Sequence, residues 1–111
     1  MQAELRGLSR FRGTSHEECG LIVHRRGKLR VVKVKNSAKN RRENYRITRL
    51  IIAIAKAKLG PGEQIVGFLH THLPHHPAYP SSHDLLGAAG NPKALHVVYK
   101  PSTGEITWYE A

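Results

Sequence analysis

The chain has 111 residues and a net charge of +10, from 18 lysines and arginines against 8 acidic residues, with a single cysteine, Cys19. This length provides for one small domain with a single core, expected over residues 1–111, and a lone cysteine excludes an internal disulfide framework and favours a reducing, cytoplasmic location. No apolar run is long enough to cross a membrane, and the basic residues are scattered without interleaved aromatic residues, which argues against a dedicated nucleic-acid-binding module.

The first predicted elements are a weak helix and a hairpin. The helix covers Ala3–Phe11, where apolar residues recur at every third position. These apolar residues are Leu5, Leu8 and Phe11. Cys19–His24 and Leu29–Lys35 are typical of strands, and Arg25–Lys28 between them indicates a turn. We expect an antiparallel hairpin with one face in solvent.

A polar loop and a second helix follow. Asn36–Asn44 is predicted to be the loop, and Tyr45–Ile47 a short extended piece. Thr48 is a suitable N-cap for a helix over Arg49–Leu59, which the Gly-Pro-Gly at residues 60–62 ends. The apolar and flanking positions of this helix are Leu50, Ile51, Ile54, Ala55 and Lys58.

The last part of the chain alternates strands with one more helix. Gln64–Leu69 reads as a buried strand, and a helix over Asp84–Ala89 follows a serine N-cap. Ala94–Tyr99 and Glu105–Tyr109 then form a hairpin through a turn that contains Pro and Gly. This order of elements predicts an α+β domain with a mixed β-sheet flanked by helices.

Two histidines follow the buried strand with one residue between them. On a strand, positions i and i+2 point to the same face, so His70 and His72 can reach one metal ion. Ser81 or Ser82 can cap the next helix and place the carboxylate of Asp84 in its first turn. Two imidazoles and one carboxylate with an open fourth position describe a catalytic zinc centre, because structural zinc sites are closed and usually rich in cysteine.

Three segments carry a resemblance to a known family. Glu17–Ile22, Gly67–His72 and Ser81–Asp84 together resemble the JAB/MPN domain with a JAMM metalloprotease motif, in its compact prokaryotic or phage-like form. The resemblance covers nearly the whole chain, from Leu5 to Tyr109, and implies a cytidine-deaminase-like fold. It departs from the family in the loop Leu73–Pro80, which is one residue longer than usual.

The resemblance also implies roles for five residues. His70, His72 and Asp84 would bind one Zn²⁺ ion, Glu17 would be the general acid/base, and Ser81 would stabilise the oxyanion. The implied activity is that of a zinc-dependent metallopeptidase, in which Glu17 takes a proton from zinc-activated water and later protonates the leaving amine.

The substrate that the resemblance implies is a protein with an extended C-terminal tail. Ubiquitin-like and sulfur-carrier-like proteins have such tails, and a role in phage tail assembly is also compatible. The chain has no room for the insertions that position polyubiquitin in eukaryotic members. The predicted elements begin with the first helix, without the strand that commonly precedes it in the family. One edge of the sheet is therefore expected to be bare or paired with a partner.

Two alternatives remain open. The domain could be a catalytically silent MPN scaffold that binds partner proteins, although such scaffolds typically lose the metal ligands. It could also, with less support, be a basic nucleic-acid-binding module. The choice of Glu17 over Glu18 rests on strand parity and on the Glu-x-x-Gly spacing to Gly20.

The remaining candidate residues have simpler interpretations. His75, His76 and His83 are expected to be exposed or to line the substrate groove, and His24 and His96 to be surface or structural histidines. Cys19 is expected to be buried and not to act as a nucleophile. Tyr79 and Trp108 fit core or edge packing as well as groove lining.

Overall fold

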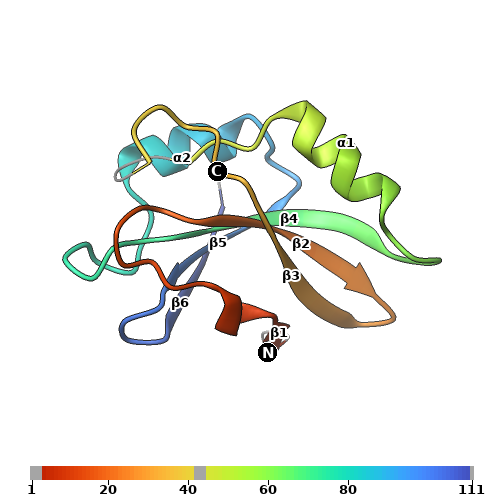
Figure 1. The fold of residues 1–111 in the computed structure, drawn as a ribbon, viewed down its shortest axis with the longest axis horizontal. Coiled ribbons are helices and arrows are strands. Elements are labelled where there is room, and N and C mark those ends of the chain that lie inside the picture. Colours follow the sequence, from red (N-terminus) through yellow and green to blue (C-terminus); the bar gives the residue numbers. More distant parts are fainter. Residues whose placement is uncertain (1–3, 42–44, 111) are drawn as a thin grey trace.

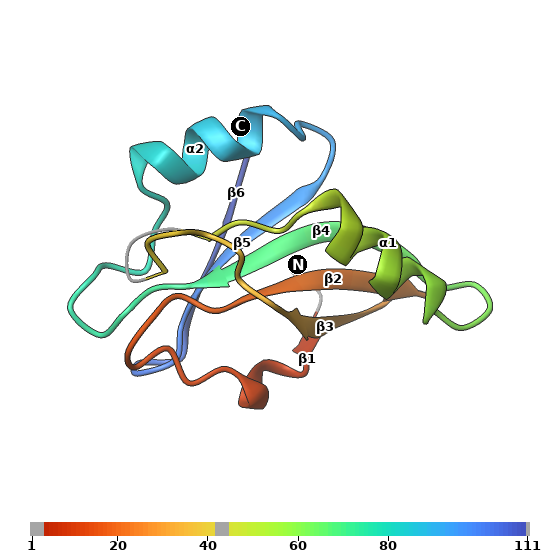
Figure 2. The ribbon, with the colours of Figure 1, turned by 45° about the horizontal axis from the view of Figure 1, so that its top comes forward.

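The computed structural model describes residues 4–41 and 45–110, which form a six-stranded mixed sheet and two α-helices (Figure 1). In spatial order the strands are β1 (Leu5–Arg6), β3 (Lys28–Val34), β2 (Cys19–Arg25), β4 (Gln64–Thr71), β5 (Leu95–Lys100) and β6 (Glu105–Tyr109). The helices α1 (Arg49–Ala57) and α2 (Ser82–Ala89) lie on the same side of the sheet in both ribbon views (Figure 1 and Figure 2). The predicted α+β class with a mixed sheet is confirmed.

Both predicted hairpins are present, and β4 lies between them. Strand β2 is antiparallel to β3, and β5 is antiparallel to β6. Strand β4 pairs antiparallel with β2 and parallel with β5. Because side chains alternate along a strand, Leu69 enters the apolar core while His70 points to the face that α2 covers.

The main apolar cluster joins the N-terminal segment to the sheet. Its buried members are Leu5, Phe11, Ile22, Leu29, Val31, Leu69 and Val97, with Leu8, Val66, Tyr99 and Trp108 packed against them. Trp108 is therefore explained by core packing, whereas Tyr79 is 61% exposed. The cluster gives the central strands a rigid support for the residues on their other face.

The predicted N-terminal helix is wrong. Leu5–Arg6 is a strand that pairs in parallel with β3, and only Leu8–Arg10 forms a short 3₁₀-helix. Ala3 lies outside the described residues. Gly7 separates the two elements with φ of 91°, a left-handed conformation that no α-helix contains. The three-residue spacing of the apolar side chains suits a strand and a 3₁₀ turn that both face the core.

The expectation of a bare sheet edge is consequently corrected. Strand β1 pairs with the outer edge of β3, with Leu5 opposite Leu29 and Arg6 opposite Arg30. This cover is two residues long, and such short edge strands are a common means of protecting a sheet from pairing with other chains.

Helix α1 is shorter and more exposed than its sequence pattern indicates. Thr48 caps it as predicted, since its hydroxyl oxygen accepts a hydrogen bond from the backbone N–H of Ile51 at 3.2 Å. The helix ends at Ala57, two residues before the predicted end. Leu50 is 69% and Ile54 49% exposed, so the apolar stripe is not buried. Among the described residues, no helix is long and apolar enough to span a membrane.

The loop structure between β3 and α1 agrees in part with the prediction made from the sequence. Residues 36–41 form no helix or strand, as expected for the polar loop, and residues 42–44 lie outside the described residues. Tyr45–Ile47 joins no strand of the sheet. The predicted domain boundaries, residues 1–111, stay a prediction.

Candidate metal centre

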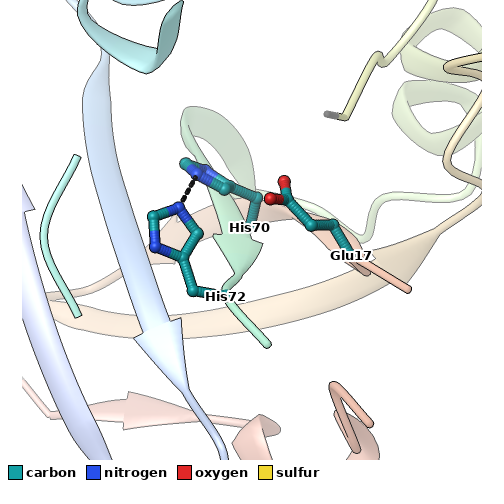
Figure 3. A group of neighbouring side chains, drawn as sticks. All are labelled: Glu17, His70 and His72. Carbon is teal, nitrogen blue, oxygen red and sulfur yellow. Dashed lines mark hydrogen bonds between the residues drawn. The ribbon is translucent and has the colours of Figure 1, made fainter. Parts of the chain in front are cut away.

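The end of strand β4 brings two histidine side chains together. The backbone N–H of His72 donates to the carbonyl of Tyr99 at 3.0 Å, so the ladder with β5 continues one residue past the strand. His70 is fully buried, and His72 is 5% exposed. Their Nε2 atoms lie 3.2 Å apart. The dashed line in Figure 3 marks this contact. Both rings therefore present a nitrogen to the same point.

The first turn of helix α2 adds a carboxylate to this pair. The hydroxyl of Ser81 accepts a hydrogen bond from the backbone N–H of Asp84 at 3.1 Å, and the backbone N–H of Ser81 donates to Oδ2 of Asp84 at 2.9 Å. This capping box fixes the Asp84 side chain. Its Oδ2 atom lies 3.1 Å from Nε2 of His70 and 3.1 Å from Nε2 of His72.

The three atoms form a triangle of the size that a tetrahedral metal ion requires. Zinc binds imidazole nitrogen and carboxylate oxygen at about 2.0–2.1 Å, which separates neighbouring tetrahedral donors by about 3.3 Å. The sides of this triangle are 3.1, 3.1 and 3.2 Å. The donor set and its spacing thus fit a divalent ion with two histidine ligands and one carboxylate ligand.

Glu17, which precedes strand β2, lies close to the two histidines. It is 2% exposed, and one ligand atom from each of Glu17, His70 and His72 lies within 4.8 Å of the others. Figure 3 shows the Glu17 carboxylate next to the His70 side chain. The backbone carbonyl of Glu17 accepts a hydrogen bond from the side-chain amide of Asn36 at 2.9 Å. Glu17 is therefore placed either as a further ligand or as a base beside the metal.

Glu18 has a different environment, as strand parity predicts. Its Oε1 accepts hydrogen bonds from the backbone N–H groups of Arg12 and Gly13, each at 2.6 Å, and its other oxygen forms an ion pair with Lys33. Burial acts to raise the pKa of Glu18, but Lys33 and the two N–H groups outweigh it and lower this pKa. Glu18 thus ties the N-terminal segment to β3.

Two of the three titratable groups of the centre, His70 and Asp84, are biased toward the forms that bind a metal, whereas His72 is biased toward its protonated form. Burial lowers the pKa of His70, although Asp84 opposes this. Burial acts to raise the pKa of Asp84, but His70 and His72 lower it far below its ordinary range. A neutral imidazole and an ionised carboxylate are the forms that bind a metal. Burial also opposes protonation of His72, but Asp84 and the carbonyl of Pro77 outweigh it and raise the pKa of His72.

Some supporting residues were not found by sequence analysis. The Tyr45 ring stacks on His70 with centroids 4.2 Å apart and planes 13° apart, and burial raises the pKa of Tyr45 to about 12. The carbonyl of Pro77 lies 2.8 Å from Nδ1 of His72, where it accepts the ring N–H and leaves Nε2 for a metal. The Pro- and His-rich composition of the loop was the only sequence signal for the second contact.

The other histidines and the cysteine lie outside this cluster of donors. His75 is exposed and its ring lies against that of His76, with centroids 4.2 Å apart and planes tilted by 58°. His24 is half-buried and accepts a hydrogen bond from the backbone N–H of Gly27 at 3.2 Å, and His96 is a buried residue held by the carbonyl of Asn91 at 3.0 Å. The side chain of His83 is not among those that the structure describes. Cys19 is fully buried, as predicted, and burial raises its pKa to about 12, so it is not a nucleophile.

Fold and site together define a small α+β domain with a buried group of side chains that could bind a metal ion. A family model described as prokaryotic homologs of the JAB domain matches residues 7–110. The chain therefore belongs to the JAB/MPN family, as the three sequence segments indicated.

Comparison with solved structures supports the same fold. The solution structure of protein DSY2949 from Desulfitobacterium hafniense superimposes with a TM-score of 0.63 at 24% sequence identity. The alignment covers 86% of this chain and 68% of that one. At this identity the similarity concerns the fold alone. Comparison with curated proteins gave no match.

Proposed function

We propose that this domain is a zinc-dependent metallopeptidase of the JAMM type, which hydrolyses a peptide or isopeptide bond. The observation that carries the proposal is the triangle formed by Nε2 of His70, Nε2 of His72 and Oδ2 of Asp84, with sides of 3.1 to 3.2 Å. Family membership adds to it. The finer expectation of a cytidine-deaminase-like fold is part of this proposal.

The proposed chemistry assigns a distinct task to each residue. His70, His72 and Asp84 would hold the zinc ion, which when bound supplies Lewis acidity and a water of lowered pKa. Glu17, buried beside the two rings, accepts the proton of the attacking water and returns it to the leaving amine. The carbonyl of Pro77 keeps His72 in the tautomer that this arrangement needs.

Ser81 is proposed to stabilise the negative charge that develops on the substrate carbonyl. Its oxygen already accepts the backbone N–H of Asp84, so the cap fixes the hydroxyl group while its O–H can donate to an oxyanion. One side chain would then both hold Asp84 and act on the substrate.

The surface beside the site supports an extended protein tail as substrate. Asp84 and Phe68 line a hollow of about 230 Å³, and Phe68 also lines a second one of about 700 Å³ along residues 65–68 of β4. Strand β4 pairs with β5 only from Gly67 onward. Within the described residues, Gln64–Val66 thus present a strand edge to which a tail can add. We propose the C-terminal tail of a ubiquitin-like or sulfur-carrier-like protein, in the cytoplasm that a lone cysteine favours.

The proposal is tested with Glu17→Gln and a matched control, Glu18→Gln. Elemental analysis of the purified protein should find about one zinc per chain in the native protein and in both variants. Mass spectrometry of ubiquitin-like and sulfur-carrier fusions should show cleavage by the native protein, with a loss of about 10²-fold or more in Glu17→Gln. Glu18→Gln should be less stable, because it weakens the contact with Lys33, but should keep its turnover.

Three results would contradict the proposal. A native protein without zinc that still captures these fusions uncleaved would favour the silent scaffold, and one without zinc that binds DNA or RNA with a steep salt dependence would favour the nucleic-acid-binding module. Equal turnover of the Glu17→Gln variant and the native protein would remove Glu17 from the mechanism.

A further inference from the structure

A basic hollow lies at the end of the sheet opposite the candidate metal centre. Its volume is about 380 Å³, and its lining residues are Arg6, Val23, Arg25, Arg26, Lys28, Leu29, Arg30 and Glu63. On strand β2, Cys19 pairs with His70, and Arg25 follows six residues later, about 20 Å away along the strand. The basic hollow is therefore a separate feature from the proposed active site.

The charges in the basic hollow are poorly balanced. It contains five cationic side chains and a single carboxylate. That carboxylate, Glu63, already accepts two hydrogen bonds from Arg30, at 2.9 and 3.0 Å, and one from the backbone of Gly60 at 2.8 Å. Within residues 4–41 and 45–110, no direct ion pair joins the other four cations to an acidic group, although the charge of Arg25 helps Arg30 to lower the pKa of Glu63. The other four cations are Arg6, Arg25, Arg26 and Lys28. Gathered like charges disfavour the fold unless an anion neutralises them.

The backbone supplies a second, independent observation. Arg26 and Gly27 form the turn between β2 and β3, with φ of 49° and 78°. A two-residue turn with both φ values positive favours Asn, Asp or Gly at its first position. Among the described residues, Arg26 is the only non-glycine residue with positive φ. Strain of this kind is characteristic of functional positions, and here it occurs at a cation that lines the basic hollow.

We propose that the basic hollow binds a short chain of linked phosphates. Guanidinium groups match phosphate oxygens in geometry and charge, and four of the five cations are arginines. The volume lies in the range of small-ligand sites. The only apolar residues of the lining are Val23 and Leu29, so no aromatic ring is present to stack a nucleobase. The phosphates themselves are thus what the site recognises, whether they come free or attached to a larger small molecule.

Calorimetric titration with tripolyphosphate at physiological ionic strength tests this proposal. Arg26→Gly removes a cation and installs the residue that the turn prefers, so the melting temperature should not fall. The affinity for tripolyphosphate should fall by about tenfold, the effect of one lost charge-assisted hydrogen bond. Arg25→Gln combined with Arg26→Gly should weaken binding further, and zinc content should be unchanged in both variants.

A double variant with the same loss of charge is the control. Arg49→Gln with Lys93→Gln removes two exposed cations that do not line the basic hollow, and it should change the affinity by less than about twofold. ATP should bind about as well as tripolyphosphate. The proposal is overturned by any of four results: no saturable binding, equal losses in the control variant, ATP binding more than about tenfold tighter, or a hexaglutamate peptide binding as tightly as tripolyphosphate.

Discussion

Ser81 shows how much of the site depends on single side chains. It caps α2 and fixes Asp84 through two hydrogen bonds, and it is also the proposed oxyanion donor. Thr48 has the same capping role at α1, with a hydrogen bond of 3.2 Å to Ile51, but it is not part of the metal centre. The two residues therefore allow the structural duty to be separated from the chemical one.

We predict that Ser81→Ala and Thr48→Ala lower the free energy of unfolding by similar amounts, about 1 kcal/mol each, since each removes an N-cap. Only Ser81→Ala should also slow turnover of the zinc-loaded protein, by about 10²-fold. Urea unfolding and initial rates, measured after zinc content has been matched, give both quantities. Equal rates for the two variants would show that Ser81 only caps the helix.

The residues of the centre were predictable where a regular element positions them. Strand alternation places His70 beside His72, a serine cap places Asp84, and parity separates Glu17 from Glu18. Tyr45 and the carbonyl of Pro77 were not predictable, because each reaches the site from a loop. Loop conformation depends on tertiary contacts that a periodic sequence pattern does not encode.

At the scale of elements, the N-terminal segment shows how tertiary pairing overrides local spacing. Leu5, Leu8 and Phe11 suggested a helix, yet β1 gains hydrogen bonds from β3 and places Leu5 in the core. Gly7 makes this possible, since a Cβ atom there would lie 2.7 Å from the carbonyl oxygen of Val31. No signal in the sequence indicated this close approach between the backbones of Gly7 and Val31.

We predict that Gly7→Ala is more destabilising than Gly104→Ala. Both glycines have positive φ, 91° and 78°, and each substitution should cost about 1 kcal/mol through backbone strain. Gly104 has open space around its Cβ position, whereas Gly7 meets Val31, so only Gly7→Ala must also push β1 away from β3. Urea unfolding of the two variants measures the difference. Equal losses would mean that β1 adds little to the stability of the sheet.

At the scale of the whole molecule, the candidate metal centre connects parts that are otherwise weakly joined. Two of the proposed ligands, His70 and His72, belong to β4 and its extension, and Asp84 belongs to α2. Of the described side chains of α2, only Asp84 and Ala88 are buried, while Leu85 is 42% and Leu86 75% exposed. The helix thus has little apolar contact to hold it on the sheet. A bound ion would contribute much of that attachment.

We predict that removal of zinc loosens α2 and leaves the central strands intact. Metal-binding free energy stabilises the elements that supply the ligands, and strands β2, β3 and β4 have their own hydrogen bonds and apolar core. Hydrogen exchange followed by mass spectrometry, with and without a chelator, should show faster exchange in Ser82–Ala89 and little change in Cys19–Arg25. The Asp84→Asn variant with zinc present should resemble the chelated protein. Unchanged exchange in α2 would show that the helix is held by its own packing, and equal acceleration in β2 would show that the ion supports the whole fold.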